Sequence, residues 1–222
     1  MQSAIVLVSG GMDSLVTAAY AAAENEEVYF LHFNYGQLTE KKELACYNEL
    51  AKFYQPVQAK VIDYHWLSEI GGSALTDSKI PLPKGKISAE NIPVTYVPFR
   101  NATFLCSAVA WAEVIKATKI YIGAVEEDSS GYPDCRELFF ESFEKVIQTG
   151  TKGAIPIKII TPVLHKSKAE IVQAGIKLNA PFHLSWSCYS DNEIACGVCE
   201  SCLLRKKAFQ EAGAIDPIPY RK

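Results

Sequence analysis

The stretch that decides the fold runs from Ala4 to Ser14 and reads AIVLVSGGMDS. Its first five residues form a continuous apolar run of strand length, which predicts a strand buried on both faces. The run ends in Ser9-Gly10-Gly11, and the alanine-rich stretch from about Asp13 to Ala23 predicts a helix directly after it. A strand, a glycine turn and a helix in this order indicate the first unit of a parallel α/β sheet.

Strand and helix patterns alternate along the rest of the chain. We expect strands at residues 28–34, 57–62, 119–124 and 157–162, and helices at 39–53, 101–116, 137–148, 167–178 and 200–212. The helix at 101–116 is apolar on most faces and is predicted to be buried. Ser167 and Glu170 fit a capping box at the start of the helix that follows them. The pattern predicts a three-layer α/β/α sandwich with a central parallel sheet, in one domain spanning residues 1–222.

Residues 71–98 interrupt this alternation with several prolines and glycines. Long loops inside compact domains are uncommon and often functional. A lid over a substrate, a dimer contact and an ordinary surface excursion all remain open for this segment.

Composition sets limits on the partners of the chain. The 222 residues carry a formal net charge of -3, which gives no bulk attraction to nucleic acid or to an anionic membrane surface. The first apolar run is too short for a secretion signal, and no apolar run approaches the ~18 residues that a membrane span needs. We therefore expect a cytoplasmic protein without membrane or nucleic-acid partners.

The glycine turn has the chemistry of a phosphate site. Glycines let the backbone approach a ligand closely, and the amide groups and dipole at a helix start favour an anion. Asp13 would repel phosphate unless a Mg2+ ion lies between, because that ion binds carboxylate and phosphate oxygens together. A plain turn with a Ser or Asp helix cap is the alternative. The spacing matches neither G-x-x-x-x-G-K-[ST] nor G-x-G-x-x-G.

Four of the seven cysteines crowd the C-terminal end in the pattern C-x7-C-x2-C-x2-C, at Cys188, Cys196, Cys199 and Cys202. Four thiolates suit a closed, tetrahedral, structural Zn2+ site, which we place in a segment spanning 185–212. An iron–sulfur cluster or a redox disulfide between Cys199 and Cys202 are the alternatives. Arg205, Lys206 and Lys207 follow at once and could offset the charge of the thiolates.

The turn resembles S-G-G-x-D-S, the pyrophosphate loop of the ATP-pyrophosphatase superfamily, which implies an adenine nucleotide alpha hydrolase-like fold. Further segments are similar to the 7-cyano-7-deazaguanine synthase family within it, in family order from about residue 5 to 217. They are Asn34-Tyr35-Gly36-Gln37, Pro98-Phe99-Arg100-Asn101, Asp128-Ser129-Ser130-Gly131-Tyr132-Pro133-Asp134-Cys135-Arg136, Lys168-Ala169-Glu170-Ile171, Trp186-Ser187-Cys188-Tyr189 and Cys196-Gly197-Val198-Cys199-Glu200-Ser201-Cys202. Ser185 stands where that family more often has Thr.

The resemblance implies a carbon–nitrogen ligase of queuosine biosynthesis that converts 7-carboxy-7-deazaguanine and ammonia to the nitrile. Transfer of AMP would activate first the acid and then the amide. ATP with Mg2+, one structural Zn2+ per subunit and a homodimer are implied with it. A tRNA-modifying adenylase and a non-catalytic, zinc-stabilised nucleotide-binding module are the competing hypotheses.

The same resemblance implies roles for individual residues. The ATP site would comprise Val8, Ser9, Gly10, Gly11, Met12, Asp13, Ser14, Leu15, Val16, Thr17 and Ala18. Asp13, Lys168 and Asp134 would be catalytic, with Lys166 as the alternative to Lys168. Arg100, Asn101, Tyr132, Asp134 and Arg136 would bind substrate. Arg100 and Asn101 would orient the nucleotide or the substrate, with a buried structural pair as the alternative, and Tyr132, Asp134 and Arg136 would contact the deazaguanine. Asp134 is suited to the donor edge of a guanine-like base. Cys135 could be a nucleophile, but adenylation already supplies the activation.

Overall fold

The computed structural model describes residues 2–83, 85, 92–126, 131–153 and 156–221. Five strands form one parallel sheet in the order β3-β2-β1-β4-β5. They are β1 (Ser3–Leu7), β2 (Glu27–Asn34), β3 (Gln58–Asp63), β4 (Lys119–Ile122) and β5 (Lys158–Ile160). The strand order reverses between β1 and β4, and open α/β sheets bind ligands at the carboxyl ends of the strands at such a point.

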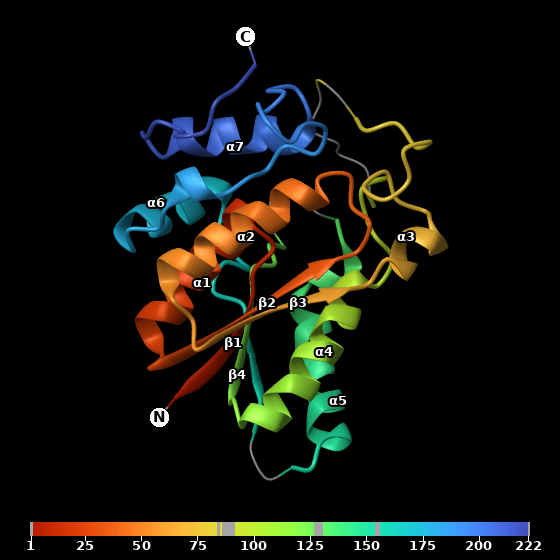
Figure 1. Ribbon diagram of the computed structural model, residues 1–222, viewed down its shortest axis with the longest axis vertical. Helices are drawn as coiled ribbons and strands as arrows, with labels where there is room; N and C mark the ends of the chain where they lie inside the picture. The colour runs from red at the N-terminus through yellow and green to blue at the C-terminus, as the bar shows by residue number, and fades with distance from the viewer. Residues whose placement is uncertain (1, 84, 86–91, 127–130, 154–155, 222) are drawn as a thin grey trace.

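Helices cover both faces of the sheet (Figure 1). They are α1 (Met12–Glu24), α2 (Glu40–Tyr54), α3 (Trp66–Ile70), α4 (Arg100–Ile115), α5 (Glu137–Gly150), α6 (Lys168–Lys177) and α7 (Glu200–Glu211). Two short 3-10 turns lie at Pro133–Cys135 and Phe182–Leu184. This arrangement confirms the predicted three-layer α/β/α sandwich, and each predicted strand and helix forms within about two residues of its expected ends.

Alternate residues of β1 face opposite layers, as the pleat of a strand requires. Ala4 and Val6 pack in a cluster with α1, α2, α6 and α7, while Ile5 and Leu7 pack in a second cluster with α4 and α5. All five residues of β1 are buried. The strand predicted to be buried on both faces is therefore buried, and it is the middle strand of the sheet.

Helix α4 differs from its prediction as a buried helix. One stripe of it is buried, formed by Asn101, Ala102, Leu105, Ala108 and Ala112, while Val114 is 77% exposed. The apolar residues around the helix outnumber those that this chain alone can bury, because one sheet face offers contact to only one side of a covering helix.

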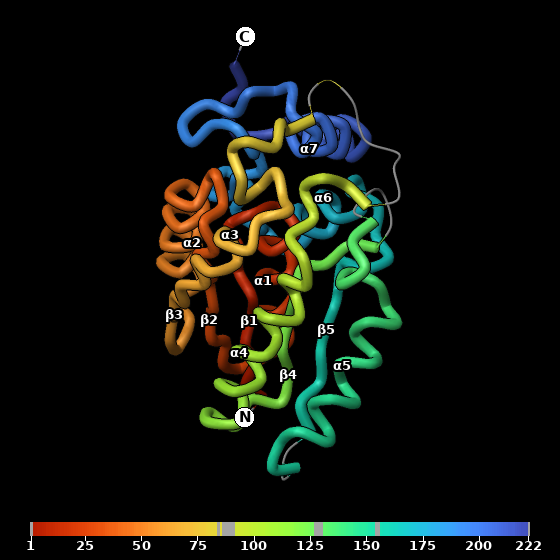
Figure 2. The backbone as a smooth tube through the Cα atoms, turned by 90° about the vertical axis from the view of Figure 1, so that its right-hand side faces the viewer, coloured from red at the N-terminus to blue at the C-terminus, as the bar shows by residue number. Residues whose placement is uncertain are grey.

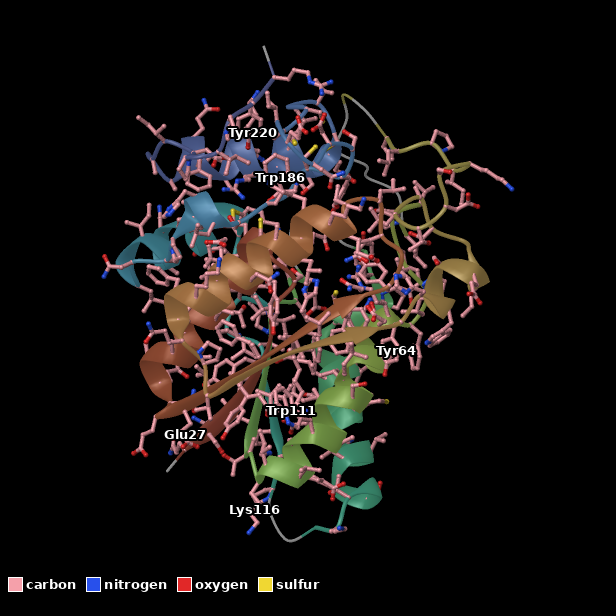
Figure 3. The ribbon with its side chains drawn as sticks, in the orientation of Figure 1. Glu27, Tyr64, Trp111, Lys116, Trp186 and Tyr220 are labelled. Atoms are coloured by element: carbon pink, nitrogen blue, oxygen red, sulfur yellow. The ribbon has the colours of Figure 1, made fainter. Side chains whose placement is uncertain are left out.

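The carboxyl ends of the strands all lie at one end of the sheet. Figure 3 shows Trp186 and Tyr220 at that end, in the layer that contains α7, whereas Glu27 and Lys116 mark the opposite end. The C-terminal segment thus covers the edge at which the strand-to-helix loops meet. No helix among the described residues is long and apolar enough to cross a membrane.

Candidate active site

The glycine turn between β1 and α1 is held in shape by its own serines. Ser14 Oγ accepts from the backbone N–H of Ser9 at 3.1 Å and donates to the carbonyl of Gly11 at 3.0 Å. Gly10 has a φ of +87°, and a Cβ there would lie 2.6 Å from the carbonyl oxygen of Glu43 in α2. Glycine is therefore required at position 10 by both conformation and close approach.

The first turn of α1 is open to a ligand. Gly11 caps the helix without a side-chain hydrogen bond, and the first amide groups of a helix have no partner within it. Those amide groups and the helix dipole attract an anion. The turn therefore has the features of the predicted phosphate site.

Asp13 and Lys168 meet at this turn, although 155 positions separate them in the sequence. Lys168 Nζ lies 2.7 Å from Asp13 Oδ2, and Lys168 is the first residue of α6. The predicted capping box is confirmed: Ser167 Oγ accepts from the backbone of Glu170, whose carboxylate accepts from the backbone of Ser167. The helix start thus fixes the lysine that reaches Asp13.

The second carboxylate oxygen of Asp13 has no hydrogen-bond partner among the described residues, although it is buried. A buried carboxylate oxygen without a donor is costly unless a cation or water satisfies it. This orphaned oxygen fits the expected Mg2+ ion, which prefers oxygen ligands.

A cavity of about 300 Å³ opens above the turn, at the point where the strand order reverses. Every strand-to-helix connection near β1 contributes to its wall, as do the start of α4 and the C-terminal cysteine segment. The predicted residues that line it are Val8, Ser9, Gly11, Met12, Asp13, Ser14, Arg100, Asn101, Tyr132 and Lys168. The structure thus brings together residues predicted from separate stretches of sequence.

The last four residues of the predicted ATP site, residues 15–18, do not line the cavity. Leu15, Val16 and Ala18 are fully buried in the core, and Thr17 donates its hydroxyl to the carbonyl of Asp13. The face of α1 that meets the sheet begins here, so these residues support the loop by packing.

Arg100 lies against two aromatic rings of the cavity wall, those of Tyr35 and Phe104, and we call these three residues the aromatic bracket. Its guanidinium donates from Nη1 to Tyr35 Oη at 3.0 Å and lies over the rings of Tyr35 and Phe104. Tyr132 lies on another wall, with its hydroxyl 2.8 Å from Thr95 Oγ1. Burial raises the pKa of Tyr35 to about 12, although the charge of Arg100 opposes the rise, so this phenol keeps its proton. Flat rings and fixed donors of this kind suit a planar heterocycle.

Asp134 and Arg136 do not line the cavity. Asp134 is buried, and its Oδ2 accepts from the backbone N–H of Asn101 at 2.9 Å, in the first turn of α4. Asn101 Nδ2 donates in turn to the carbonyl of Asp134 at 3.1 Å. Arg136 is exposed at the start of α5. Both residues lie outside the cavity wall, and Asp134 positions the helix that carries Arg100.

Several cavity residues were given no role from the sequence, although Gln37, Trp186, Tyr189 and Glu200 lie in segments that resemble the family. They include two carboxylates, several polar and aromatic side chains and one glycine: Glu43, Glu200, Gln37, Thr39, Phe104, Trp186, Tyr189 and Gly123. A Cβ at Gly123, directly after β4, would lie 2.9 Å from the backbone of Asp13 and Ser14, so this glycine lets β4 approach the phosphate turn. Gln37 and Gly123 lie just after the ends of β2 and β4, and this position is the signal that could have identified them as site residues.

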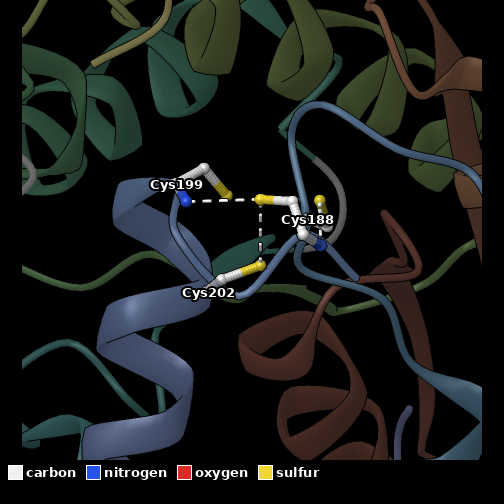
Figure 4. Close-up of side chains that lie close together, drawn as sticks. Cys188, Cys199 and Cys202 are labelled. Carbon is white, nitrogen blue, oxygen red and sulfur yellow. Dashed lines mark hydrogen bonds between the residues drawn. The ribbon is translucent and has the colours of Figure 1, made fainter. Parts of the chain in front are cut away.

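The four clustered cysteines converge at the start of α7. The Sγ atoms of Cys188, Cys196, Cys199 and Cys202 all lie within 4.8 Å of one another. Cys199 and Cys202, from the start of α7, face Cys188 from the preceding loop (Figure 4). Four sulfur atoms at such spacing suit one tetrahedral ion. This confirms that the group could hold a metal such as zinc.

Arg205 takes another role than neutralising these thiolates. It is 1% exposed and forms a two-pronged ion pair with Asp216, at 2.9 Å from Nε and 3.0 Å from Nη2. Its Nη1 also donates to Ser185 Oγ at 2.9 Å. The backbone N–H of Trp186 then donates to the carbonyl of Gly10. Arg205 thereby ties α7 and the cysteine segment to the phosphate turn.

The sequence matches the profile of the family described as queuosine biosynthesis protein QueC over residues 3–213. The chain belongs to the QueC family. A relative from Chlorobaculum tepidum, named 7-cyano-7-deazaguanine synthase, is 53% identical over 98% of this chain and 96% of its own length. One from Chloroherpeton thalassium carries the same name and is 53% identical over 98% and 96%.

Among solved structures, a predicted subunit of tRNA methyltransferase from Methanocaldococcus jannaschii resembles this QueC family member. Its TM-score is 0.51 at 16% identity, and the likeness covers 100% of this chain and 93% of that one. A likeness at this identity supports the fold alone. Residues 128–130 of the QueC segment that ends at Arg136 lie outside the described residues.

Proposed function

We propose that this QueC family member joins ammonia to 7-carboxy-7-deazaguanine and converts the product to 7-cyano-7-deazaguanine, with ATP as the energy source. The observation that carries the proposal is the single cavity in which the phosphate turn, the Asp13–Lys168 pair and the aromatic bracket around Arg100 meet. The full-length similarity to relatives with that name supports the same substrate.

The chemistry needs two activations at one phosphate site. A carboxylate is a poor electrophile, so its oxygen attacks the α-phosphorus of ATP, pyrophosphate leaves, and an acyl-adenylate forms. Ammonia attacks the acyl carbon and AMP leaves. The amide oxygen then attacks a second ATP, and loss of AMP leaves the nitrile. The α1 amide groups and Lys168 would stabilise charge on the phosphates in both rounds.

Asp13 would hold Mg2+ through the oxygen that Lys168 does not contact. The ion supplies neutralisation of phosphate charge when bound. Lys168, rather than Lys166, is the lysine we assign to this role, because it contacts Asp13 and lines the cavity. Asp134 would act indirectly, by holding the first turn of α4 and with it Arg100.

The cysteine group would hold one structural Zn2+ per chain. The ion would fix the loop from Trp186 to Tyr189, which lines the cavity, against the start of α7. Exposed apolar side chains on α4 and α5, among them Val114 at 77% and Leu138 at 71%, support a homodimer. The net charge of -3 supports a cytoplasmic enzyme of small molecules without a nucleic-acid partner.

The test is turnover by the purified protein. With ATP, Mg2+, ammonium and 7-carboxy-7-deazaguanine, mass spectrometry should detect the nitrile together with AMP. AMP production that requires tRNA would instead indicate a tRNA-modifying adenylase. Bound ATP without turnover would indicate a binding module. Either of these results would refute the proposed reaction.

A further inference from the structure

Glu43 is a cavity carboxylate that neither the phosphate chemistry nor the aromatic bracket uses. It projects from the first turns of α2, the helix against which Gly10 of the phosphate turn packs. Asp13 and Lys168 belong to α1 and α6, and Figure 2 shows α2 and α6 on either side of α1. Glu43 therefore lines the same cavity as Asp13 and Lys168, but from a third helix, whose backbone lies next to Gly10.

The carboxylate of Glu43 is held in one orientation. Its Oε1 accepts from Thr39 Oγ1 at 2.8 Å, and its Oε2 accepts from Gln37 Nε2 at 3.0 Å. Gln37 is itself fixed, since its Oε1 accepts from the backbone of Tyr35 at 2.9 Å. A carboxylate offers about four acceptor positions, so those not taken by Gln37 and Thr39 remain for a ligand in the cavity.

Burial raises the pKa of Glu43, and this effect outweighs the hydrogen bonds from Gln37 and Thr39 and the charge of Arg100, which lower it. A raised pKa makes the carboxylate a better proton acceptor near neutral pH. Among its titratable neighbours, burial raises the pKa of Tyr35 to about 12 and that of Cys46 to about 11, so neither ionises in the neutral range. Glu40 lies one turn earlier on the same helix and pairs with His65.

The proposed reaction needs such an acceptor, and only at certain steps. Neither adenylation moves a proton, because a carboxylate oxygen and an amide oxygen attack phosphorus without losing one. Ammonium must lose one proton before it can attack the acyl carbon, and the added nitrogen loses a second proton as the amide forms. The amide nitrogen carries two protons and the nitrile nitrogen carries none, so both must leave. Proton removal at nitrogen is therefore the part of the chemistry that the phosphate site cannot supply.

We propose that Glu43 is the proton acceptor for the substrate nitrogen, an inference that rests on the proposed function. In the first round it takes a proton from ammonium and passes it to water. The C–N bond then forms, the C–O bond to AMP breaks, and the added nitrogen loses a second proton to Glu43, which again releases it to water. In the second round the adenylated amide loses one N–H proton to water in the open cavity. Glu43 takes the last N–H proton as C≡N forms and the C–O bond breaks, with the electron pair leaving on AMP. Glu43 then releases its proton to water.

The test uses Glu43→Gln, which keeps the size and removes the basic oxygen. With the amide as substrate, the variant should still release pyrophosphate in a first burst. Its kcat for the nitrile should fall at least ~100-fold, the usual contribution of general base catalysis. The dissociation constant of the amide should stay within about threefold, because binding is unchanged, whereas KM should fall with kcat because the adenylated amide accumulates. In the wild type, the rate of nitrile formation should rise with pH as Glu43 ionises. The variant should not show this rise.

Glu49→Gln is the matched control, because Glu49 lies on the same helix but is exposed and pairs with Lys52. If Glu43→Gln fails to fold, Glu43→Asp replaces it and should retain the pH limb at reduced kcat. Nitrile formation within about threefold of the wild type in Glu43→Gln would overturn the proposal. Loss of the pyrophosphate burst with ATP binding intact would overturn it too, because the residue would then act in adenylation. A wild type that makes no nitrile would instead refute the proposed function.

Discussion

At the level of single residues, Gly10 sets the shape of the phosphate turn. Its φ of +87° lies in the left-handed region, and its missing side chain makes room for the backbone of Glu43. Gly213 has a similar φ of +70°, but a Cβ added there would meet nothing within 4 Å. A substitution at Gly213 therefore measures the cost of the left-handed backbone without any steric contact.

We expect Gly213→Ala to lower the free energy of unfolding by about 1 kcal/mol, the cost of a left-handed backbone for alanine. Gly10→Ala should cost about 3 kcal/mol and abolish ATP binding, because α2 must move away from the turn. Urea denaturation and calorimetric titration with ATP measure the two effects. Equal losses in both variants, with ATP still bound, would show that the close approach has no role.

Lys168 and Lys166 form a natural pair for a second test. Lys168 contacts Asp13 at 2.7 Å and lines the cavity, whereas Lys166 lies beyond the capping residue of α6. Lys168→Met should reduce kcat by about 10²–10³-fold, as expected for loss of one fixed donor to a transition state. Lys166→Met should leave steady-state kinetics near those of the wild type. The reverse order would assign the charge-neutralising role to Lys166.

At the level of elements, Arg205 joins α7 to the C-terminal segment and to Ser185. Removing one partner of a buried ion pair leaves a charge without compensation. We therefore expect Arg205→Met or Asp216→Leu to lower the free energy of unfolding by about 3–5 kcal/mol. The double variant should recover much of that loss, because both charges are then absent.

Lys207→Met is the control for this pair, since Lys207 lies on the same helix but its contact with Glu211 is exposed. It should change stability by less than about 0.5 kcal/mol. Chemical denaturation of all four variants gives the coupling energy. Additive losses from Arg205 and Asp216 would contradict a shared ion pair.

The elements themselves were predictable from local pattern to different degrees. The run AIVLV and the glycines after it were enough to predict β1 and the turn, because burial on both faces leaves a continuous apolar signal. The five-residue helix α3 was missed, since it is too short to show a period. Helix α4 looked buried all round because apolar residues lie on faces that this chain leaves exposed.

The site was predictable where it follows contiguous motifs and not where it depends on tertiary contact. The phosphate turn and the four cysteines could be identified because each forms a short motif that is continuous in the sequence. The Asp13–Lys168 pair joins residues far apart in the chain, and only the fold shows which lysine reaches Asp13. Asp134 has the right chemistry for a base edge, but its carboxylate is occupied by the start of α4. Glu43 looks like any exposed helix carboxylate until α2 is placed beside Gly10.

At the level of the whole molecule, the proposed zinc ion would link the C-terminal segment to the cavity. We expect elemental analysis of the protein to find one zinc per chain. Cys199→Ser should lose the ion and lower Tm, because binding of the ion contributes directly to folding. Cys106→Ser should keep both, since Cys106 is exposed and far in sequence from the cluster. Iron with acid-labile sulfide in place of zinc would support an iron–sulfur cluster instead.

The central claim concerns where ATP is cut. We propose that the turn from Ser9 to Ser14 binds the β- and γ-phosphates and leaves the α-phosphorus open to an incoming oxygen. Phosphorus NMR of a complete reaction mixture tests this most directly. The account predicts AMP and pyrophosphate in equal amounts, with twice as much AMP as nitrile, and no products from Asp13→Ala. Formation of ADP and orthophosphate instead would contradict it.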